Sequence, residues 1–134
     1  MLKLPQTQKM EVFMFKKLFI FASLGLALSS SHANEVFDKY PNGDPTAGKQ
    51  IFISKNNGAF ESCASCHTDN LKSNGKHAKT SREIKPFAPI SNPERFTDLA
   101  KVEKWFKRNC NDVFSRECST KEKSDIIAYA RSIK

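Results

Sequence analysis

The residues with the clearest capacity for chemistry in this chain lie in the run Cys63-Ala64-Ser65-Cys66-His67. Two thiols separated by two residues and followed at once by an imidazole form the attachment pattern of a c-type haem. In that chemistry both thiolates add to the vinyl groups of the porphyrin, and the histidine becomes the proximal iron ligand. The pattern therefore predicts one covalent haem c on Cys63 and Cys66, with its iron bound to His67.

Two other uses of such a cysteine pair suit the rest of the chain less well. A thiol–disulfide exchange pair is expected beside a βαβ unit, and the sequence has no such pattern. A structural zinc ion needs four ligands, and no second closely spaced cysteine pair follows. The adjoining histidine and the export signal described next both favour haem.

The first 33 residues have the features of a secretory signal peptide. Lys16 and Lys17 precede an apolar run over residues 18–28, and residues 31–33 resemble an Ala-x-Ala cleavage site. The apolar run is short for a span of the bilayer, which makes an uncleaved membrane anchor the less favoured alternative. We therefore expect a cleaved leader over residues 1–33 and one mature domain over residues 34–134. Such a protein is periplasmic and does not span the membrane when mature.

The composition of the expected mature domain limits its partners. It holds 18 lysines and arginines against 13 aspartates and glutamates, a net charge of +5. That modest positive charge suits docking to an acidic redox partner. No basic patch interleaved with aromatic residues is present, so nucleic acid is not an expected partner. No protein-based catalytic acid or base is evident either, and whether the haem acts as a terminal oxidase or reductase stays open.

Three helices are expected to surround the haem, giving an all-α domain. Asp44 begins a helix that ends near residues 56–58, Asp98 caps a second that runs from Leu99 to about residue 109, and a capping box at residues 119–122 starts the third. The first and last helices are expected to cross, with Gly48 at a close approach.

The remaining segments are expected to be irregular. Residues 35–43 are expected to form a polar lead-in, and residues 68–85 a long polar loop. A loop of that length needs a surface to wrap, and a haem supplies one. Phe87 and Ile90, in the proline-punctuated stretch that follows, are therefore expected to pack against the haem.

The second axial ligand of the iron has to come from elsewhere in the chain. Ordinary small cytochromes c use a methionine sulfur there, but the methionines of this chain all lie in the expected leader: Met1, Met10 and Met14. The open alternatives are a lysine, a cysteine thiolate from Cys110 or Cys118, the imidazole of His77, and the amide of Asn109.

Asn109 is favoured by its place on the helix that begins at Leu99. At about 100° per residue it falls on one side with Val102, Trp105 and Phe106. A polar amide on an apolar face needs a partner when it is buried. Iron, or a molecule bound to iron, could be that partner, and so could the end of the helix itself.

A second pair of cysteines follows immediately. In an exported protein, Cys110 and Cys118 are expected to form a disulfide, which closes a short loop and fixes the end of the helix that carries Asn109. Thiolate ligation to iron is the alternative, although it would leave the other cysteine without a partner.

Several further stretches resemble one family. They are Lys85-Pro86-Phe87-Ala88-Pro89, residues 92–98, Glu103-Lys104-Trp105-Phe106-Lys107-Arg108-Asn109-Cys110 and Arg116-Glu117-Cys118. With the haem motif, these stretches resemble the SHP group of monohaem cytochromes c, and the resemblance covers nearly all of the mature domain.

The resemblance implies a class I cytochrome c fold and a high-spin haem. It also implies an asparagine ligand, here Asn109, that leaves the iron on reduction so that O2 or another diatomic molecule such as NO binds. The nearby disulfide would be Cys110–Cys118. Trp105 and Phe106, on the same side of the helix as Asn109, are expected to bind the haem. The electron donor implied is a dihaem cytochrome c linked to a membrane cytochrome b. The alternative function is a plain electron carrier with a fixed sixth ligand such as His77.

Overall fold

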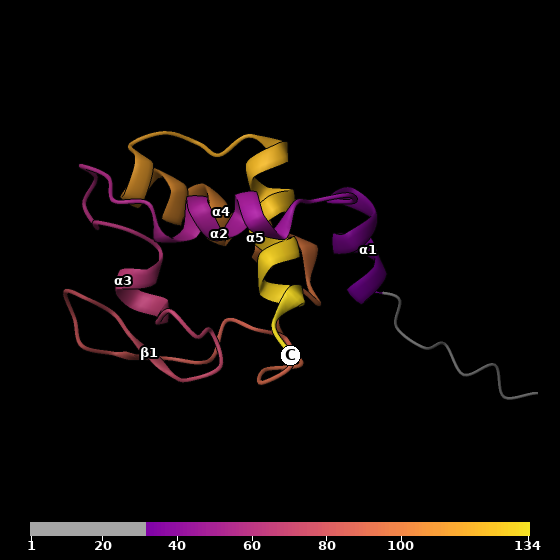
Figure 1. The fold of residues 1–134 in the computed structure, drawn as a ribbon, viewed down its shortest axis with the longest axis horizontal. Coiled ribbons are helices and arrows are strands. Elements are labelled where there is room, and N and C mark those ends of the chain that lie inside the picture. Colours follow the sequence, from indigo (N-terminus) through magenta and orange to yellow (C-terminus); the bar gives the residue numbers. More distant parts are fainter. Residues whose placement is uncertain (1–31) are drawn as a thin grey trace, which may run out of the picture.

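The computed structural model describes residues 32–134, and the fold over this range is helical (Figure 1). The helices are α1 (His32–Lys39), α2 (Pro45–Ile53), α3 (Ala64–His67), α4 (Leu99–Phe114) and α5 (Thr120–Ser132). Two short strands, β1 (Gly75–Lys76) and β2 (Glu83–Ile84), pair antiparallel as a hairpin. Residues 1–31 of the predicted signal peptide lie outside the described residues. Between residues 32 and 134, no helix is long and apolar enough to cross a membrane.

Helices α2 and α5 cross, as the sequence predicts (Figure 1). The side chain of Asp44 caps α2 by accepting a hydrogen bond from the Thr46 amide at 2.8 Å. At the crossing, a β carbon added to Gly48 would lie 1.9 Å from the carbonyl oxygen of Asp125. Only glycine lets the two backbones approach so closely. The two helices therefore form a tight framework on which the site is built.

Helix α4 begins where the sequence predicts and ends later. Asp98 accepts a hydrogen bond from the Lys101 amide at 2.9 Å, which fixes the start. The helix continues to Phe114 rather than stopping near Asn109, and it ends at Ser115, which has a left-handed backbone conformation with φ of 57°. Burial of the Val113 side chain stabilises this extra turn.

The prediction of a polar lead-in over residues 35–43 is wrong. Helix α1 packs against α4, and Val36 and Tyr40 are buried. The Tyr40 hydroxyl and the Lys39 amine both meet the carboxylate of Glu103 on α4, the amine at 2.8 Å. The apolar side chains of this segment therefore form a helix because α4 offers them a surface.

Aromatic side chains connect these elements in the core. Phe52 of α2 is fully buried, and its ring centroid lies 5.7 Å from that of Tyr129 of α5 and 5.2 Å from that of Phe87. The capping box of α5 is present, with Ser119 and Glu122 bonded reciprocally. The cluster of aromatic rings extends from the α2–α5 crossing toward the haem motif.

Candidate haem site

The cysteine–histidine motif forms the single turn of α3. Cys63 stands at the start of the turn, and the amides of Cys66 and His67 both donate to its carbonyl oxygen at 3.2 Å. Ahead of the turn, the Ser62 and Ser65 hydroxyl oxygens lie 3.0 Å apart, and each hydroxyl accepts the other residue's amide. Cys63 and Cys66 carry free, partly buried thiols, which the turn presents three residues apart on one side.

The hairpin supports this turn from behind. A β carbon added to Gly75 of β1 would lie 1.9 Å from the carbonyl oxygen of Cys66, so the hairpin backbone is in direct contact with the turn. The Ala78 amide approaches the Cys66 sulfur at 3.4 Å. The hairpin could not be predicted from the sequence, since strands of two residues leave no alternating pattern.

The imidazole of His67 lies among aromatic rings. Its centroid is 4.9 Å from that of Phe87 and 6.1 Å from that of Phe52. Burial, with a smaller contribution from the charge of Arg95, lowers the pKa of His67 to about 4. The ring is therefore neutral at physiological pH, which is the form that binds iron.

The donor atoms of this site fit a haem c. Within the described residues, the buried Nδ1 atom of His67 has no hydrogen-bond partner, so the imidazole is held by packing alone. Burial raises the pKa of the Cys63 thiol to about 11, so this sulfur is uncharged and suited to an apolar neighbour. Between residues 32 and 134, no group of three or more His, Cys, Asp or Glu side chains could hold a metal ion without a porphyrin.

The side chains predicted to pack on the haem differ in how far the protein itself covers them. Phe87 packs beside His67, held by its own amide and that of Ala88, which donate to the Leu71 carbonyl at 3.0 and 2.9 Å. Phe106 is partly buried against the core. Trp105 is 43% exposed and Ile90 is 64% exposed. Contact of these four side chains with haem stays a prediction.

Asn109 occupies the inward side of α4 near its end. Its neighbours on this side are Phe106 one turn earlier and Val113 one turn later, and Val113 is buried. Over residues 32–134, the Asn109 side-chain amide makes no hydrogen bond to the protein. The Asn111 amide, two residues on, donates to the Lys107 carbonyl at 2.6 Å. Asn109 is partly exposed, and its side-chain amide is thus free to bind a partner outside the protein chain.

The end of α4 is bonded to the chain that leads into the haem motif. The Phe60 amide, three residues before Cys63, donates to the carbonyl of Asp112 at 3.1 Å, three residues after Asn109. A β carbon on Gly58 would lie 2.3 Å from the Val113 carbonyl oxygen. The segment of α4 that carries Asn109 is therefore bonded directly to the segment that leads into the attachment cysteines.

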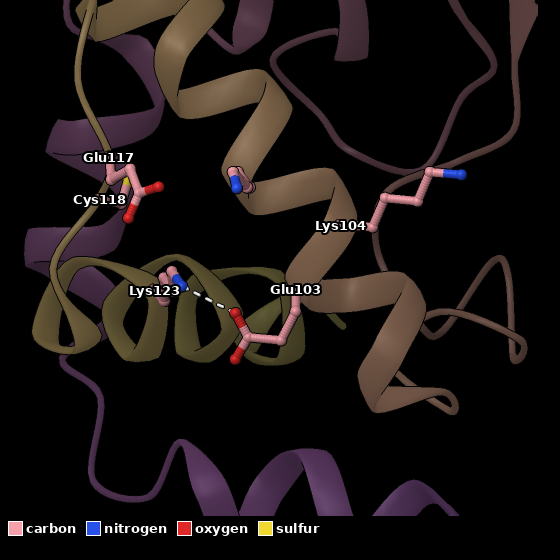
Figure 2. Close-up of a pocket in the computed structure, with 6 residues that line it drawn as sticks. Glu103, Lys104, Glu117, Cys118 and Lys123 are labelled. Atoms are coloured by element: carbon pink, nitrogen blue, oxygen red, sulfur yellow. Dashed lines mark hydrogen bonds and ion pairs between the residues drawn. The ribbon is translucent and has the colours of Figure 1, made fainter.

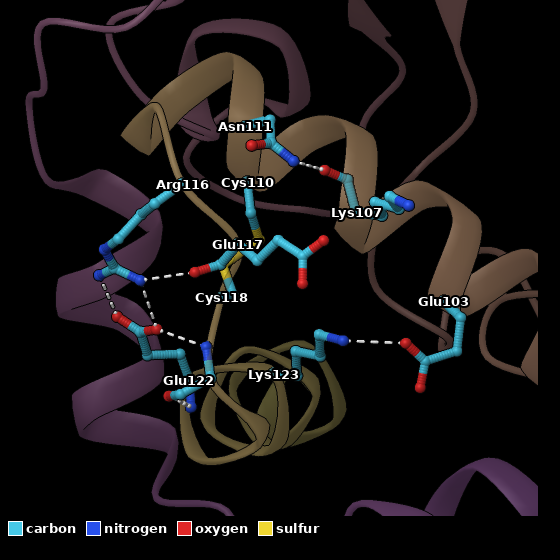
Figure 3. The surroundings of a disulfide bond; sticks show 10 residues. Glu103, Lys107, Cys110, Asn111, Arg116, Glu117, Cys118, Glu122 and Lys123 are labelled. Atoms are coloured by element: carbon cyan, nitrogen blue, oxygen red, sulfur yellow. Dashed lines mark hydrogen bonds and ion pairs between the residues drawn. A yellow bond between two sulfur atoms is a disulfide. The ribbon is translucent and has the colours of Figure 1, made fainter.

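A disulfide joins Cys110 to Cys118, with a Cα–Cα distance of 5.6 Å (Figure 3). It links the residue after Asn109 to the segment that enters α5, where Arg116 and Glu122 pair at 2.6 Å. Because both sulfurs are used, thiolate ligation of iron by either cysteine has no support.

A cavity of about 350 Å³ borders this disulfide. Its walls carry both signs of charge, and Figure 2 shows Lys123 reaching toward Glu103, with Nζ 2.9 Å from the carboxylate oxygen. The lining residues are Glu103, Lys104, Lys107, Glu117, Cys118 and Lys123.

His77, the rival axial ligand, belongs to the hairpin that packs behind α3. Its ring meets Phe60 edge-on, with centroids 5.2 Å apart. Its Nδ1 atom accepts a hydrogen bond from the Thr80 amide at 3.2 Å and lies 3.0 Å from the Thr80 hydroxyl. These contacts hold the His77 ring within its own loop.

Arg95 is a residue of this region that the sequence reasoning assigned no role. Its guanidinium donates to the carbonyls of Lys85 at 2.8 Å and Pro86 at 2.9 Å, and it lies 5.6 Å from the centre of the Phe87 ring. Backbone carbonyls are available at every position, so such contacts leave no sequence pattern by which Arg95 could have been found.

Comparison with known proteins also indicates a c-type cytochrome. Residues 39–130 match the family described as "Domain of unknown function (DUF1924)". The chain is 42% identical over 89 residues to cytochrome c-type protein SHP of Cereibacter sphaeroides, which is 64% of this chain and 68% of the relative. It is 46% identical over 87 residues to cytochrome c'' of Methylophilus methylotrophus, which is 63% of this chain and 60% of that relative.

Solved structures of the same two types are similar in fold. Oxidised SHP, described as an oxygen-binding cytochrome c, superposes with a TM-score of 0.67 at 35% identity, over 76% of this chain and 94% of the other. The solution structure of Methylophilus methylotrophus cytochrome c'', which addresses haem-ligand detachment, has a TM-score of 0.62 at 38% identity. That match covers 75% of this chain and 92% of the other.

Proposed function

Because this chain belongs to the SHP-type cytochromes c, we propose that it binds O2 or another diatomic molecule such as NO once its haem has been reduced. It has the all-α cytochrome c fold of this family and carries covalently attached haem c with iron. Cys63 and Cys66 hold the haem, His67 is the firm axial ligand, and Asn109 is the displaceable one.

The chemistry of the proposal is a difference in ligand strength. Haem iron, when bound, supplies a one-electron couple and a coordination position that can be open or closed. The amide oxygen of Asn109 is a hard, weak donor that suits the ferric ion better than the softer ferrous ion. Asn109 would therefore hold this position in the oxidised protein and release it on reduction. The freed amide can then donate a hydrogen bond to the incoming diatomic molecule.

The observation that carries this proposal is the free amide of Asn109. Among the described residues it has no protein partner, and the side chain is only partly buried beside Phe106 and Val113 on α4. The amide is therefore available to bond a partner outside the protein chain. The hydrogen bond between Phe60 and Asp112 brings this part of α4 close to the attachment turn, which supports iron as the partner.

A plain electron carrier with His77 as fixed ligand is the second candidate. The packing of the His77 hairpin close to α3 favours it, since the Ala78 amide lies only 3.4 Å from the Cys66 sulfur. Against it, the His77 ring already bonds Thr80 and packs on Phe60. His77 would have to give up these contacts to reach the side of the iron opposite His67.

The same proposal includes export and a redox partner. Residues 1–33 act as a cleaved signal peptide, and residues 34–134 work in the periplasm. The electron donor is a dihaem cytochrome c linked to a membrane cytochrome b, approached through the positive surface of the mature domain. Mass spectrometry of the secreted protein would give the cleavage site directly, and cleavage elsewhere than after Ala33 would revise the boundary.

The axial ligand is tested with Asn109→Ala and the matched control Asn111→Ala. Asn109→Ala should keep its covalent haem but change the ferric spin state and the rates of ligand binding, whereas Asn111→Ala should leave both unchanged. Asn109→Met should close the site with a strong ligand and slow CO binding to the reduced protein. A native ferrous spectrum of the low-spin six-coordinate type, with Asn109→Ala silent, would instead favour His77.

A further inference from the structure

The strongest unexplained charge in the described chain is that of Arg95. Burial lowers the pKa of its guanidinium, yet no carboxylate within residues 32–134 forms an ion pair with it. The nearest acid in sequence, Glu94, faces Lys85 at 3.8 Å in an exposed pair. A partly buried cation without a counter-charge is unfavourable, so this arrangement is incomplete without an anion.

The guanidinium is also held in a fixed orientation. Its Nε atom donates to the Pro86 carbonyl and its Nη2 atom to the Lys85 carbonyl. An arginine has five N–H donors, so three remain for a further acceptor. Two backbone anchors on one side chain are typical of an arginine that presents its free donors in one direction.

The position of Arg95 identifies the acceptor. Its guanidinium stacks over Phe87 at 5.6 Å, and the same ring lies 4.9 Å from the imidazole of His67. One aromatic ring thus separates the cation from the iron ligand. A haem bound to His67 would carry two propionate carboxylates at its edge, and a carboxylate is the acceptor that a guanidinium with free donors binds most strongly.

We propose that Arg95 binds a haem propionate and thereby sets the charge next to the iron. The inference rests on the haem site of the proposed function, but it does not depend on Asn109. The bond would anchor the irregular segment over residues 85–96 to the haem edge. It would also compensate a negative charge that otherwise stabilises the ferric state.

The test compares reduction potentials of the haem-loaded protein. Arg95→Gln should lower the equilibrium constant for one-electron reduction about tenfold, a shift of about 59 mV to more negative potential. Arg95→Lys keeps the charge and should recover most of the loss. Arg82→Gln, which removes an exposed arginine from the hairpin, should shift the potential far less. No shift in Arg95→Gln, or an equal shift in Arg82→Gln, would overturn the proposal.

A second measurement uses the wild-type protein and so does not depend on whether an Arg95 variant folds. A crystal structure of the haem-loaded wild-type protein should show a propionate oxygen about 2.7–2.9 Å from an Arg95 nitrogen. Both propionates bonded to other residues or to solvent would overturn the proposal. The two ideas fail separately, because Asn109 is judged by spin state and CO binding, and Arg95 by potential and contact distance.

Discussion

The two axial sides of the proposed iron site are supported in opposite ways. On the near side, His67 packs against Phe87 and Phe52, and the α3 turn rests on the backbone of Gly75. On the far side, Asn109 projects an unbonded amide from a helix whose end is secured by the Cys110–Cys118 disulfide. The near side fixes the side chain itself, whereas the far side fixes only the helix that carries it.

Under the proposed function, this difference would explain how one fold holds one ligand firmly and another weakly. A ring packed against other rings loses contacts if it moves, so His67 is expected to stay in place in both oxidation states. An amide without protein bonds loses nothing but its bond to iron. The proposed ligand exchange would therefore be confined to the far side.

The largest effect is expected from breaking the near side with Gly75→Ala. The new β carbon would meet the Cys66 carbonyl at 1.9 Å, and neither backbone can yield without moving the attachment turn. We expect a loss of about 3 kcal/mol in unfolding free energy, measured by urea denaturation, and reduced covalent haem content. Asn74→Ala, at the exposed neighbouring position, is the control. Equal stability of the two variants would show that the hairpin does not support α3.

A smaller effect is expected on the far side when the disulfide is removed by Cys110→Ser with Cys118→Ser. Loss of a cross-link over a sequence separation of 8 residues should cost about 2–3 kcal/mol. Haem attachment should survive, because α3 is untouched, while CO association should change as the end of α4 loosens. Unchanged CO kinetics would mean that the disulfide stabilises the chain without positioning Asn109.

The smallest effect is expected for Glu103→Gln, at the start of α4. Burial alone would raise the pKa of Glu103, but hydrogen bonds from Lys123, Lys39 and Tyr40 outweigh it and hold the pKa at about 2. The ionised carboxylate therefore stabilises the fold above about pH 4.5, and this contribution is lost as the pH falls toward 2.

After allowance for solvent screening, the substitution should cost about 1 kcal/mol near neutral pH. The difference from wild type should shrink on acidification, as followed by thermal unfolding at several pH values. Glu117→Gln, at an exposed carboxylate without a bonded partner in the described structure, serves as the control. A difference that grew in acid would contradict the assignment.

Much of the fold could be predicted because the signals were local. Asp44, Asp98 and Ser119 each begin a helix where their side chains cap the first turn, and Gly48 marks the crossing it was expected to mark. Caps and close-packed glycines act over a few residues, so the sequence displays them directly.

The features missed depend on contacts between distant segments. Helix α1 exists because Val36 and Tyr40 bury themselves against α4, and the last turn of α4 exists because Val113 is covered. Similarly, the β1–β2 hairpin is stabilised by the α3 turn rather than by its own pattern. Tertiary burial of this kind overrides local preference and cannot be read from spacing alone.

The residues of the site likewise include some that were predictable from local sequence and others that were not. Cys63, Cys66 and His67 form a contiguous motif, so both their chemistry and their relative placement were predictable. The face of α4 that carries Asn109 followed from helical periodicity, but the missing partner of its amide became evident only in the fold. The role of Arg95 could not be predicted from the sequence, because it depends on which side chains lie near the guanidinium in the fold.

The clamped end of α4 has a kinetic consequence for the proposed ligand exchange. With the disulfide on one flank and the Phe60–Asp112 hydrogen bond on the other, the helix has little freedom to swing away. The far side must then open by rotation about the χ1 and χ2 bonds of Asn109. Rotamer changes occur far faster than helix or domain displacements, so the rate of opening should depend little on solvent viscosity.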